Sequence, residues 1–527
     1  MTEGGEKELS TFRPVIYNSG INMRVQLFVP PQGYVAQRWG EGTSMPPLGI
    51  LSLAAVLEKE GVEVDVVPAD ILGLSWKDVR DRIDSFRPHV VGGTTTTENR
   101  FDSFRLTSVA KQVNPEIVTV LGGPHISMSG TETLNHIRDV DITVKGEGER
   151  SLIELVRAIR SGSGIDQVKG LHLRRSGGIV YTGDREWIED LDVLPFPARH
   201  LVPMDKYHFY VSTADGRKRK AQNIMTSRGC PFDCYFCATP TNWGRHVRGH
   251  SPERVLAEIE HLIDVYGAEF IWFYDDTLNY NPRRLHRIMD MILERKLNIK
   301  FCNEFRIDLV DKPLLAKMVE AGLVWGHFGV EAGSERVRKE IVGKAFDIEQ
   351  AYNFVRWAKE LDFVPDAFII YSHHTETWEE ALETIGIIDE LKAINPKTEI
   401  STSILHVYPG TPLEDIAKRE GIIPPDFSWA VKKDMKKVPL LPAAQGNVPL
   451  FKDRLTWFQI ADLIMRGSGA GTRVLSPSKW RSLFSGLFSG GHLGVYIVFF
   501  LVWTKYRIKR LLGKSTSKEE TRDVAVG

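Results

Sequence analysis

The sequence has few cysteines and almost no net charge. Each of these features makes one class of protein less suitable as an interpretation. Only four of its 527 residues are cysteine, and the formal net charge is −1. A secreted domain stapled by disulfides is much richer in cysteine, so we expect a reducing, cytoplasmic setting. Because a nearly neutral chain creates no strong global field, nucleic acid is not an expected partner. Residues 1–20 lack the apolar stretch of a secretory signal, so we expect no leader peptide.

A long hydrophobic run is also missing, with one partial exception near the C-terminus. Residues 493–503 read LGVYIVFFLVW, and five basic residues follow within 505–514. A membrane-spanning helix needs about 20 apolar residues, and extending this run back to 483 takes in serine, glycine and histidine. We therefore expect a shallow anchor near 483–514, on the cytoplasmic face, whose cationic flank suits anionic lipid headgroups. A buried C-terminal helix is the alternative.

Two series of alternating apolar runs and amphipathic stretches fill most of the chain. The first covers 21–165, and its regular β–α alternation favours a doubly wound α/β domain with a parallel sheet. Residues 166–215, with three prolines in LPFPARHLVP, are typical of a connector. The second series, 216–425, holds about six βα units and predicts a partial (β/α)6 barrel. We expect a disordered lead at 1–20 and a mainly helical C-terminal region at 426–527.

Three of the four cysteines lie in one loop. Cys230, Cys234 and Cys237 stand in SRGCPFDCYFCATP, directly after the first strand of the second series. Thiolates hold iron–sulfur clusters, and three thiolates leave one iron of a four-iron cluster without a protein ligand. A small molecule such as S-adenosylmethionine (SAM) can chelate that iron, and one electron then cleaves it to an adenosyl radical. The alternative is a structural zinc site completed by His246 and His250.

This cysteine motif resembles that of the radical SAM superfamily, CxxxCxΦC, and the resemblance spans residues 222–415. It implies a [4Fe–4S] cluster on the three cysteines, with SAM as its other ligand and an electron donor such as ferredoxin or flavodoxin. Phe236, the aromatic residue before the last cysteine, is implied to pack near the adenine of SAM. Further SAM contacts are implied at the carboxyl ends of the strands, where barrel sites are built, at Asp275, Asp276, Glu304, Arg306, Glu331, Gly333 and Ser334.

One turn departs from the family pattern. Members usually carry a glycine-rich, GLPGET-like turn after the fifth strand, whereas this chain reads YSHHTET. Without the glycines, close approach of that backbone to SAM is not expected. His373 and His374 are instead candidate polar groups of the substrate site, and the alternative is that they are ordinary loop residues.

The first half of the chain resembles a flavodoxin-like cobalamin-binding domain. Four segments carry the resemblance, in order: PPLGILSLAAVLEKEG, TTTT at 94–97, LGGPH at 121–125 and KGEGE at 145–149. The same order precedes the barrel in cobalamin-dependent radical SAM enzymes. It implies a glycine-lined slot for cobalamin at the strand ends, with contacts from Thr95, Thr96, Gly122, Gly123 and Glu147.

A second departure concerns the lower ligand of cobalt. Many cobalamin domains carry DxHxxG, whose histidine binds cobalt, but the nearest match here has Leu72 in that place, two residues after Asp70. We therefore expect no histidine ligand. The fourth cysteine, Cys302, lies inside an apolar strand and is expected to be a small buried residue.

Together these features predict a cobalamin-dependent radical SAM enzyme. Its expected reaction is C-methylation at an unactivated carbon of a lipophilic small molecule, because the apolar C-terminal run favours a membrane surface. One alternative is a radical cyclase or a lipid- or tetrapyrrole-remodelling enzyme with the same cofactors. Another is a non-catalytic iron–sulfur or corrinoid sensor.

Overall fold

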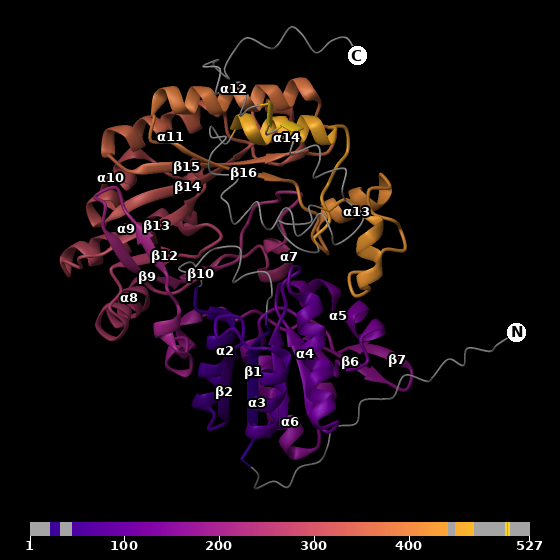
Figure 1. Cartoon of the computed structure of the whole chain (residues 1–527). Helices are drawn as coiled ribbons and strands as arrows, with labels where there is room; N and C mark the ends of the chain where they lie inside the picture. Colours follow the sequence, from indigo (N-terminus) through magenta and orange to yellow (C-terminus); the bar gives the residue numbers. More distant parts are fainter. Residues whose placement is uncertain (1–21, 32–44, 441–447, 468–500, 503, 506–527) are drawn as a thin grey trace, which may run out of the picture.

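A computed structural model describes residues 22–31, 45–440, 448–467, 501–502 and 504–505. These residues form two α/β units, one after the other in the chain (Figure 1). The expected lead at 1–20 lies outside the described residues. So does the expected membrane anchor, apart from the four described residues past 500. Within the described ranges, none of the helices combines the length and the apolarity that crossing a bilayer requires.

The first unit is built on a seven-stranded sheet of order β2-β1-β3-β4-β5-β6-β7. Neighbouring strands from β2 to β5 run parallel, and the order 2-1-3-4-5 is that of the flavodoxin-like doubly wound fold. The fold class predicted from the sequence is confirmed. The strands are β1 (Arg24–Val29), β2 (Glu63–Pro68), β3 (Val90–Thr94), β4 (Val118–Gly122), β5 (Ile142–Val144), β6 (Leu171–Arg175) and β7 (Gly178–Tyr181).

Helices cover both faces of this sheet, and their apolar spacing decides the packing. In α3, Val79 and Ile83 lie one turn apart, so both are buried against the sheet, and the Ser75 side chain caps the N-terminus. Helices α3 and α4 share one hydrophobic cluster, while α2 and α6 share another on the opposite face. The helices are α2 (Leu48–Lys59), α3 (Trp76–Phe86), α4 (Arg100–Val113), α5 (Pro124–His136) and α6 (Gly148–Ser161).

A hairpin inside the connector expected at 166–215 extends the first sheet. β6 pairs antiparallel with β5, and β7 pairs antiparallel with β6. After β7 the chain makes three short 3-10 turns, at Leu191–Val193, Arg199–Leu201 and Met204–Lys206, on its way to the second unit. The extended, proline-rich stretch therefore begins after β7.

The second unit is an open, curved sheet of order β16-β15-β14-β13-β12-β9-β8. The six strands from β9 to β16 run parallel, and β8 pairs antiparallel with β9. The predicted partial barrel is confirmed. Its strands are β8 (Tyr210–Ser212), β9 (Lys218–Ile224), β12 (Phe270–Phe273), β13 (Lys300–Phe305), β14 (Leu323–Glu331), β15 (Val364–Tyr371) and β16 (Glu399–Ile404), and the small antiparallel pair β10 (Ser227–Arg228) and β11 (Arg248–Gly249) stands apart.

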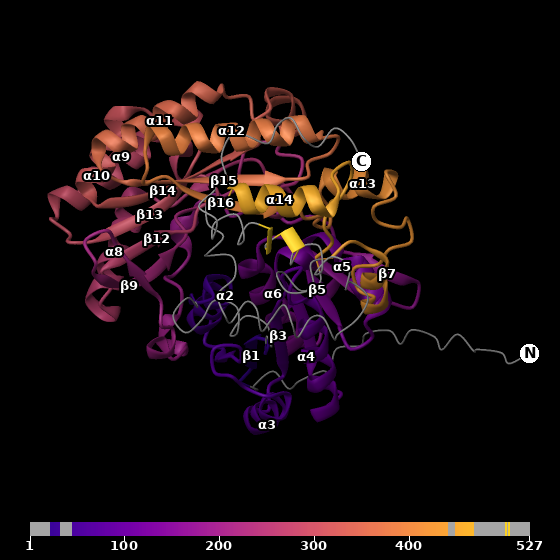
Figure 2. The same ribbon diagram turned by 45° about the horizontal axis from the view of Figure 1, so that its top comes forward.

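Helices line the convex side of the second sheet, as Figures 1 and 2 show. Alternate strand residues such as Phe328 and Val330 point into this helix-covered core, which leaves Trp325 and His327 on the other face. The carboxyl ends of the strands are consequently free to carry a site. The helices are α7 (Thr239–Trp243), α8 (Pro252–Tyr266), α9 (Pro282–Glu294), α10 (Lys312–Ala321), α11 (Ile348–Leu361) and α12 (Trp378–Ile394), with α13 (Pro412–Arg419) and α14 (Trp457–Gly467) following β16.

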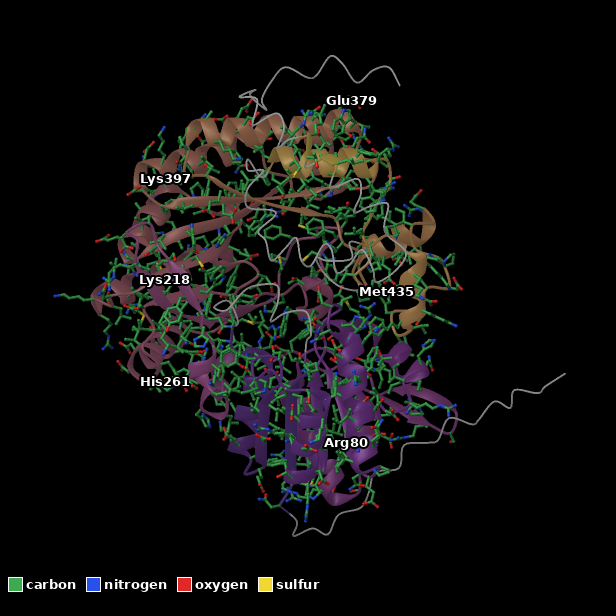
Figure 3. All side chains as sticks on the ribbon, viewed as in Figure 1. Arg80, Lys218, His261, Glu379, Lys397 and Met435 are labelled. Carbon is green, nitrogen blue, oxygen red and sulfur yellow. The ribbon has the colours of Figure 1, made fainter. Side chains whose placement is uncertain are left out.

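The segment after α13 ties the two units together. The fully buried Arg100 of α4 donates through Nε to the carbonyl of Trp429 at 2.8 Å and through Nη2 to Met435 Sδ at 2.9 Å. Ser428 Oγ donates to Glu132 of α5 at 2.5 Å. Met435 marks this junction in Figure 3, where charged side chains such as Arg80, Lys218 and Lys397 stand on the outside.

A buried ion pair holds the linking segment to the barrel. Arg199 is 1% exposed, and its Nη1 donates to Glu258 of α8 at 2.9 Å. Its Nη2 donates to the carbonyl of Asn223 in β9 at 2.8 Å. Arg254 also pairs with Glu258, at 3.3 Å. The first barrel strand is therefore pinned at the point where the chain enters the second unit.

Replacing Arg199 with alanine is expected to lower the free energy of unfolding by about 3 kcal/mol, because it leaves Glu258 and a strand carbonyl buried with fewer partners. Urea unfolding followed by circular dichroism measures the change. Lys77→Ala, which breaks an exposed pair with Asp81, is the control and is expected to leave the midpoint unmoved. Equal midpoints for the two variants would contradict this account.

Candidate active site

A cavity of about 490 Å³ lies between the two units. The loops after the parallel strands of the first unit form one wall, as the rule for doubly wound sheets predicts. The end of β9 and the region around the cysteine loop form the other wall. The lining includes Gly92–Thr94, Thr96, Gly122–Pro124 and Gly146–Glu149 on the first side, and Asn223, Met225, Arg228, Trp243, His250 and Tyr274 on the second.

Four of the five residues predicted to contact cobalamin line this cavity, and the fifth lies behind its wall. Thr96, Gly122, Gly123 and Glu147 are lining residues. Thr95 is fully buried, and its backbone bonds to Gly122 and His125. Gly123 has φ +99°, and a Cβ there would lie 2.9 Å from the Thr95 backbone. Only glycine fits this close approach of the two loops.

A buried cluster of four charges joins the cavity wall to the cysteine loop. Arg228 Nη1 donates to Glu147 at 2.8 Å, and Nη2 donates to Glu149 at 2.6 Å. Arg248 Nη1 donates to Glu147 at 2.8 Å as well. Burial opposes the charge on Arg228, but Glu149 and Glu147 outweigh it and hold the pKa of Arg228 above its usual value. Burial likewise opposes the charge on Glu149, but Arg228, a backbone hydrogen bond and Arg248 together lower its pKa.

The cysteine loop begins at Cys230, two residues after Arg228 of this cluster. The intervening Gly229 has φ +102°, and a Cβ on it would stand 2.6 Å from the His246 carbonyl, so the loop requires glycine there. Cys237 N–H donates to the carbonyl of Cys234 at 2.9 Å. Cys237 Sγ accepts from the Thr239 N–H at 3.5 Å.

The three thiols fit a cluster site. All are free and partly exposed, and they are near enough to influence one another's charge. Burial is the main cause that raises the pKa of Cys234 to about 11, and it also raises the pKa of Cys237. Such thiols ionise readily only against a strong positive charge, which iron supplies.

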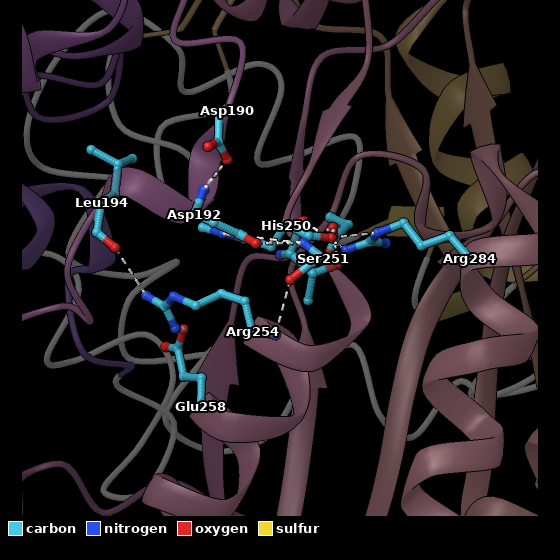
Figure 4. Close-up of polar contacts among 10 residues, drawn as sticks. Asp190, Asp192, Leu194, His250, Ser251, Arg254, Glu258 and Arg284 are labelled. Carbon is cyan, nitrogen blue, oxygen red and sulfur yellow. Dashed lines mark hydrogen bonds and ion pairs between the residues drawn. The ribbon is translucent and has the colours of Figure 1, made fainter.

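The histidines of the alternative zinc site have other partners. His250 Nδ1 bonds to Asp192 at 2.9 Å (Figure 4), and the exposed His246 faces Glu189 at 3.4 Å. In the same close-up Arg254 lies between Glu258 and the carbonyl of Leu194. Within the described residues, no three His, Cys, Asp or Glu side chains converge on a single metal ion.

The two adjacent aspartates after β12 have different settings. Asp275 is 2% exposed, and it accepts from the Thr226 hydroxyl at 2.8 Å and the Ser227 hydroxyl at 2.5 Å. Its carboxylate thus fixes the chain just ahead of the cysteines. Asp276 opens onto the site and accepts from Thr239 Oγ1 at 3.0 Å. The side chain of Asp276 is exposed, but the protein around it displaces much of the water near its carboxyl group. This desolvation is the main cause that raises the pKa of Asp276 to about 7, and the negative charges of Asp275 and Glu304 raise it further.

Glu304 and Arg306 lie on β13 and directly after it. Glu304 is open to the concave side of the barrel, and its pKa is raised, first by desolvation. Arg306 lies over the ring of Phe232 in the cysteine loop, 3.6 Å from its centroid, and pairs with Asp308 at 2.7 Å. Its Nη1 is buried with no hydrogen-bond partner among the described residues. An unsatisfied N–H donor of Arg306 beside the cysteines can hydrogen-bond to a polar ligand.

Glu331 ends β14 in a strained backbone conformation, with φ +65°. It pairs with Lys344 at 2.7 Å, and Lys344 also donates to the carbonyl of Gly329 at 2.9 Å. Ser334 Oγ donates to Glu380 at 3.2 Å. Non-glycine residues with positive φ concentrate at functional sites, because only a well-determined surrounding holds them.

The remaining predicted residues lie around the same strand ends. Gly333 packs so closely on α12 that a Cβ would stand 2.6 Å from Thr384 Cα. Phe236 is half-buried, with its ring 6.3 Å from that of His373. The imidazole of His374 instead packs near Phe451 and faces Glu420 at 3.6 Å. Cys302 is fully buried, as expected.

Comparison with known proteins decides the family. Residues 224–388 match the profile of the Radical SAM superfamily, and residues 42–156 match that of the B12 binding domain. An uncharacterized methyltransferase of Pyrococcus horikoshii, PH0819, is 33% identical over 395 residues, which are 75% of this chain and 83% of that protein. The chain is a cobalamin-binding member of the radical SAM superfamily. Its cofactors are therefore a [4Fe–4S] cluster, SAM and cobalamin.

Two further comparisons agree with this. The anaerobic magnesium-protoporphyrin IX monomethyl ester cyclase of Rubrivivax gelatinosus is 31% identical over 69% of this chain and 65% of its own length. A solved structure of TsrM, a radical SAM methyltransferase from Kitasatospora setae with cobalamin and a [4Fe-4S] cluster bound, matches 93% of this chain and all of that chain. Its TM-score is 0.65 at 17% identity, which shows a shared fold.

Sequence reasoning missed several residues of this radical SAM site. Arg228, Glu149 and Lys344 form its buried ion pairs, and Tyr235 bonds to the loop after β15. Arg228 lies in the motif SRGC and Glu149 lies in KGEGE. The sequence did hold a signal for this pair, because the two motifs carry opposite charges and belong to domains that are expected to face one another. Lys344 gave no comparable signal, because it lies in a turn far from any motif.

The segment around Leu72 is not part of the described cavity wall in this radical SAM protein. It follows β2 at the edge of the first sheet, and neither Asp70 nor Leu72 lines the cavity. Burial raises the pKa of Asp70 to about 6 from its usual 3.8, and Oδ1 is buried with no partner among the described residues. Between about pH 4 and pH 6 the folded protein therefore holds a proton on Asp70 that the unfolded chain releases.

Asp70→Asn is expected to stabilise the protein by about 2 kcal/mol at pH values above about 7. Because the folded pKa is the higher one, the stability of the wild type falls as pH rises from about 4 to about 6, while the asparagine variant lacks this loss. Urea unfolding of both proteins across this pH range provides the test. A difference between them that is the same at every pH would contradict the assignment.

Proposed function

We propose that this protein is a C-methyltransferase that acts on an unactivated carbon of a small molecule. The observation that carries the proposal is the cavity between the units, whose walls come from the glycine-rich loops of the B12-binding domain and from Arg228 next to the cysteine loop. A methyl donor in that cavity and a radical source on the cysteines would lie at opposite sides of one substrate. Juxtaposition of this kind is what a transfer between two cofactors requires.

When bound, the cluster and SAM supply a radical that abstracts hydrogen, and cobalamin supplies the methyl group. The chain's own residues bind, orient and shield. Cys230, Cys234 and Cys237 would hold the cluster, while Arg228 and Glu147 keep the loop at the cavity wall. A substrate enclosed between the two walls would be shielded from water, which protects a radical from side reactions.

Individual cofactor contacts are part of this proposal. We place SAM against the open Asp276, against Glu304 and against the Glu331–Lys344 pair, because these groups meet at the strand ends beside the cysteines. Phe236, Arg306 and Ser334 flank the same strand ends. Asp275 supports the loop from behind, since its oxygens are bonded to Thr226 and Ser227. Thr96, Gly122 and Gly123 would approach cobalamin, with Thr95 supporting them.

We further propose that the substrate is lipophilic. The apolar run at 493–503 and its basic flank support it, since together they suit the interface of an anionic membrane. A peripheral position on the cytoplasmic face would bring the protein to such a substrate. The reaction also needs an electron donor, and a ferredoxin or flavodoxin is the proposed one.

Two alternatives use the same architecture. One is a radical cyclase or another lipid- or tetrapyrrole-remodelling enzyme, which the likeness to the Rubrivivax gelatinosus cyclase favours. The other is a non-catalytic iron–sulfur or corrinoid sensor, for which the described residues supply no additional domain. The mass of the product distinguishes a cyclase or remodelling enzyme from a methyltransferase. Cleavage of SAM distinguishes an enzyme from a non-catalytic sensor.

Reconstituted protein with cobalamin, a reductant and SAM labelled with deuterium in its methyl group is expected to convert a component of a bacterial lipid extract. The product should gain one labelled methyl in place of hydrogen, with 5′-deoxyadenosine formed alongside, as mass spectrometry can show. Oxygen insertion or loss of hydrogen without a label would favour the cyclase. Absence of 5′-deoxyadenosine in protein with a full iron content would contradict enzymatic function.

The cysteines provide the matched control for this experiment. Cys234→Ala removes a cluster thiolate and is expected to abolish 5′-deoxyadenosine formation. Cys302→Ala removes a thiol that is fully buried in β13 and should leave product formation within about twofold of wild type. Retained activity in Cys234→Ala would overturn the assignment of the cluster.

A further inference from the structure

The loop after β15 is bonded directly to the cysteine loop. Tyr235 stands between Cys234 and Cys237, and its hydroxyl lies 3.1 Å from Nδ1 of His373. The backbone N–H of His374 donates to the same hydroxyl at 3.2 Å. Because burial is the main cause that lowers the pKa of His373 to about 4, the ring is neutral, and we assign Tyr235 as donor to Nδ1.

This loop contains left-handed backbone conformations although it has no glycine. Ser372 has φ +71° and Thr375 has φ +60°, which is unfavourable for residues with a Cβ. Glu376 stabilises the turn by accepting from the N–H groups of Ser372 at 2.8 Å and of His373 at 3.0 Å. The turn therefore holds two left-handed residues without a glycine, and the Glu376 carboxylate supports them from inside the loop.

His373 also reaches the strand end that carries Glu331. The side chain is 1% exposed, and the backbone carbonyls of Glu331 and Ile370 lie beside its ring. Nε2 has no hydrogen bond of good geometry among the described residues. One imidazole therefore contacts the cysteine loop on one side and the strained end of β14 on the other.

We propose that His373 is a positioning residue of the iron–sulfur site, which fixes the Tyr235 segment between two cluster cysteines relative to the end of β14. The hydroxyl of Tyr235 is held from two sides, and the carbonyl of Tyr235 accepts from the Leu413 N–H at 3.1 Å. With three bonds on one residue, the peptide between Cys234 and Cys237 has little freedom. Where other members present a glycine-rich backbone, this chain presents an imidazole that holds the cluster loop.

The Tyr235→Phe variant tests this, because it removes the hydroxyl and keeps the ring. We expect the reconstituted variant to retain its fold and most of its iron. Loss of the bond should lower the rate of reductive SAM cleavage by about tenfold. It should also change the response of the reduced cluster's electron paramagnetic resonance spectrum to added SAM, which a purely structural contact would leave alone.

Substitutions of His373 provide the second measurement. His373→Ala should reproduce the Tyr235→Phe effects, whereas His373→Asn should restore most of the cleavage rate, because the asparagine oxygen can accept where Nδ1 does. If the alanine variant fails to fold, Tyr235→Phe alone decides. Tyr352→Phe is the control, since it removes a hydroxyl that bonds to Glu390 on the outer helices.

The outcome that overturns the proposal is specific. Tyr235→Phe would fold, bind a full complement of iron, and show the wild-type cleavage rate and the wild-type spectral response to SAM, and so would His373→Ala if it folds. A loss shared equally by Tyr352→Phe would also overturn it, because the effect would then be general destabilisation. Loss in Tyr235→Phe with recovery in His373→Asn supports it.

Discussion

The pairing of Arg228 with Glu147 and Glu149 is the interaction on which the arrangement of this molecule depends. Buried charges persist only when they are paired and hydrogen-bonded, and Arg228 has both of its partners in the other unit. Because Arg228 stands two residues before Cys230, the same contact fixes the start of the cysteine loop. The loop that carries Glu147 also lines the cavity, so one ion cluster sets the distance between two cofactor sites.

Local patterns in the sequence predicted most of the fold. Apolar periodicity and turn residues gave both βα series, since neighbouring strands and helices of such folds follow one another in the chain. The cysteine motif is equally local, because its three cysteines fall within eight residues. The hairpin β6–β7 falls inside the stretch expected to be a connector, because its pairing cannot be read locally. Its polar, glycine-containing sequence carries no signal that it pairs with β5.

Contacts between distant parts of the chain could not be predicted in this way. Arg228 and Glu149 are 79 positions apart, and Tyr235 and His373 are 138 apart. Residue type alone also gives no direction, because Asp275 turns inward to Thr226 while Asp276 opens to the site. His373, a candidate for the substrate site, bonds to the cysteine loop. Each case depends on which neighbour is nearest in space, and that information appears only when the two units are packed together.

The central claim is that the cavity and the cysteine loop are held as one unit by Arg228. Equilibrium titration of cobalamin into reconstituted Arg228→Gln, followed by its absorbance, tests this most directly, with Arg217→Gln at an exposed pair as the control. We expect a folded variant in which cobalamin affinity and the spectral response of the cluster to SAM fall together, by about tenfold or more. Wild-type cobalamin affinity in a folded Arg228→Gln protein would contradict it.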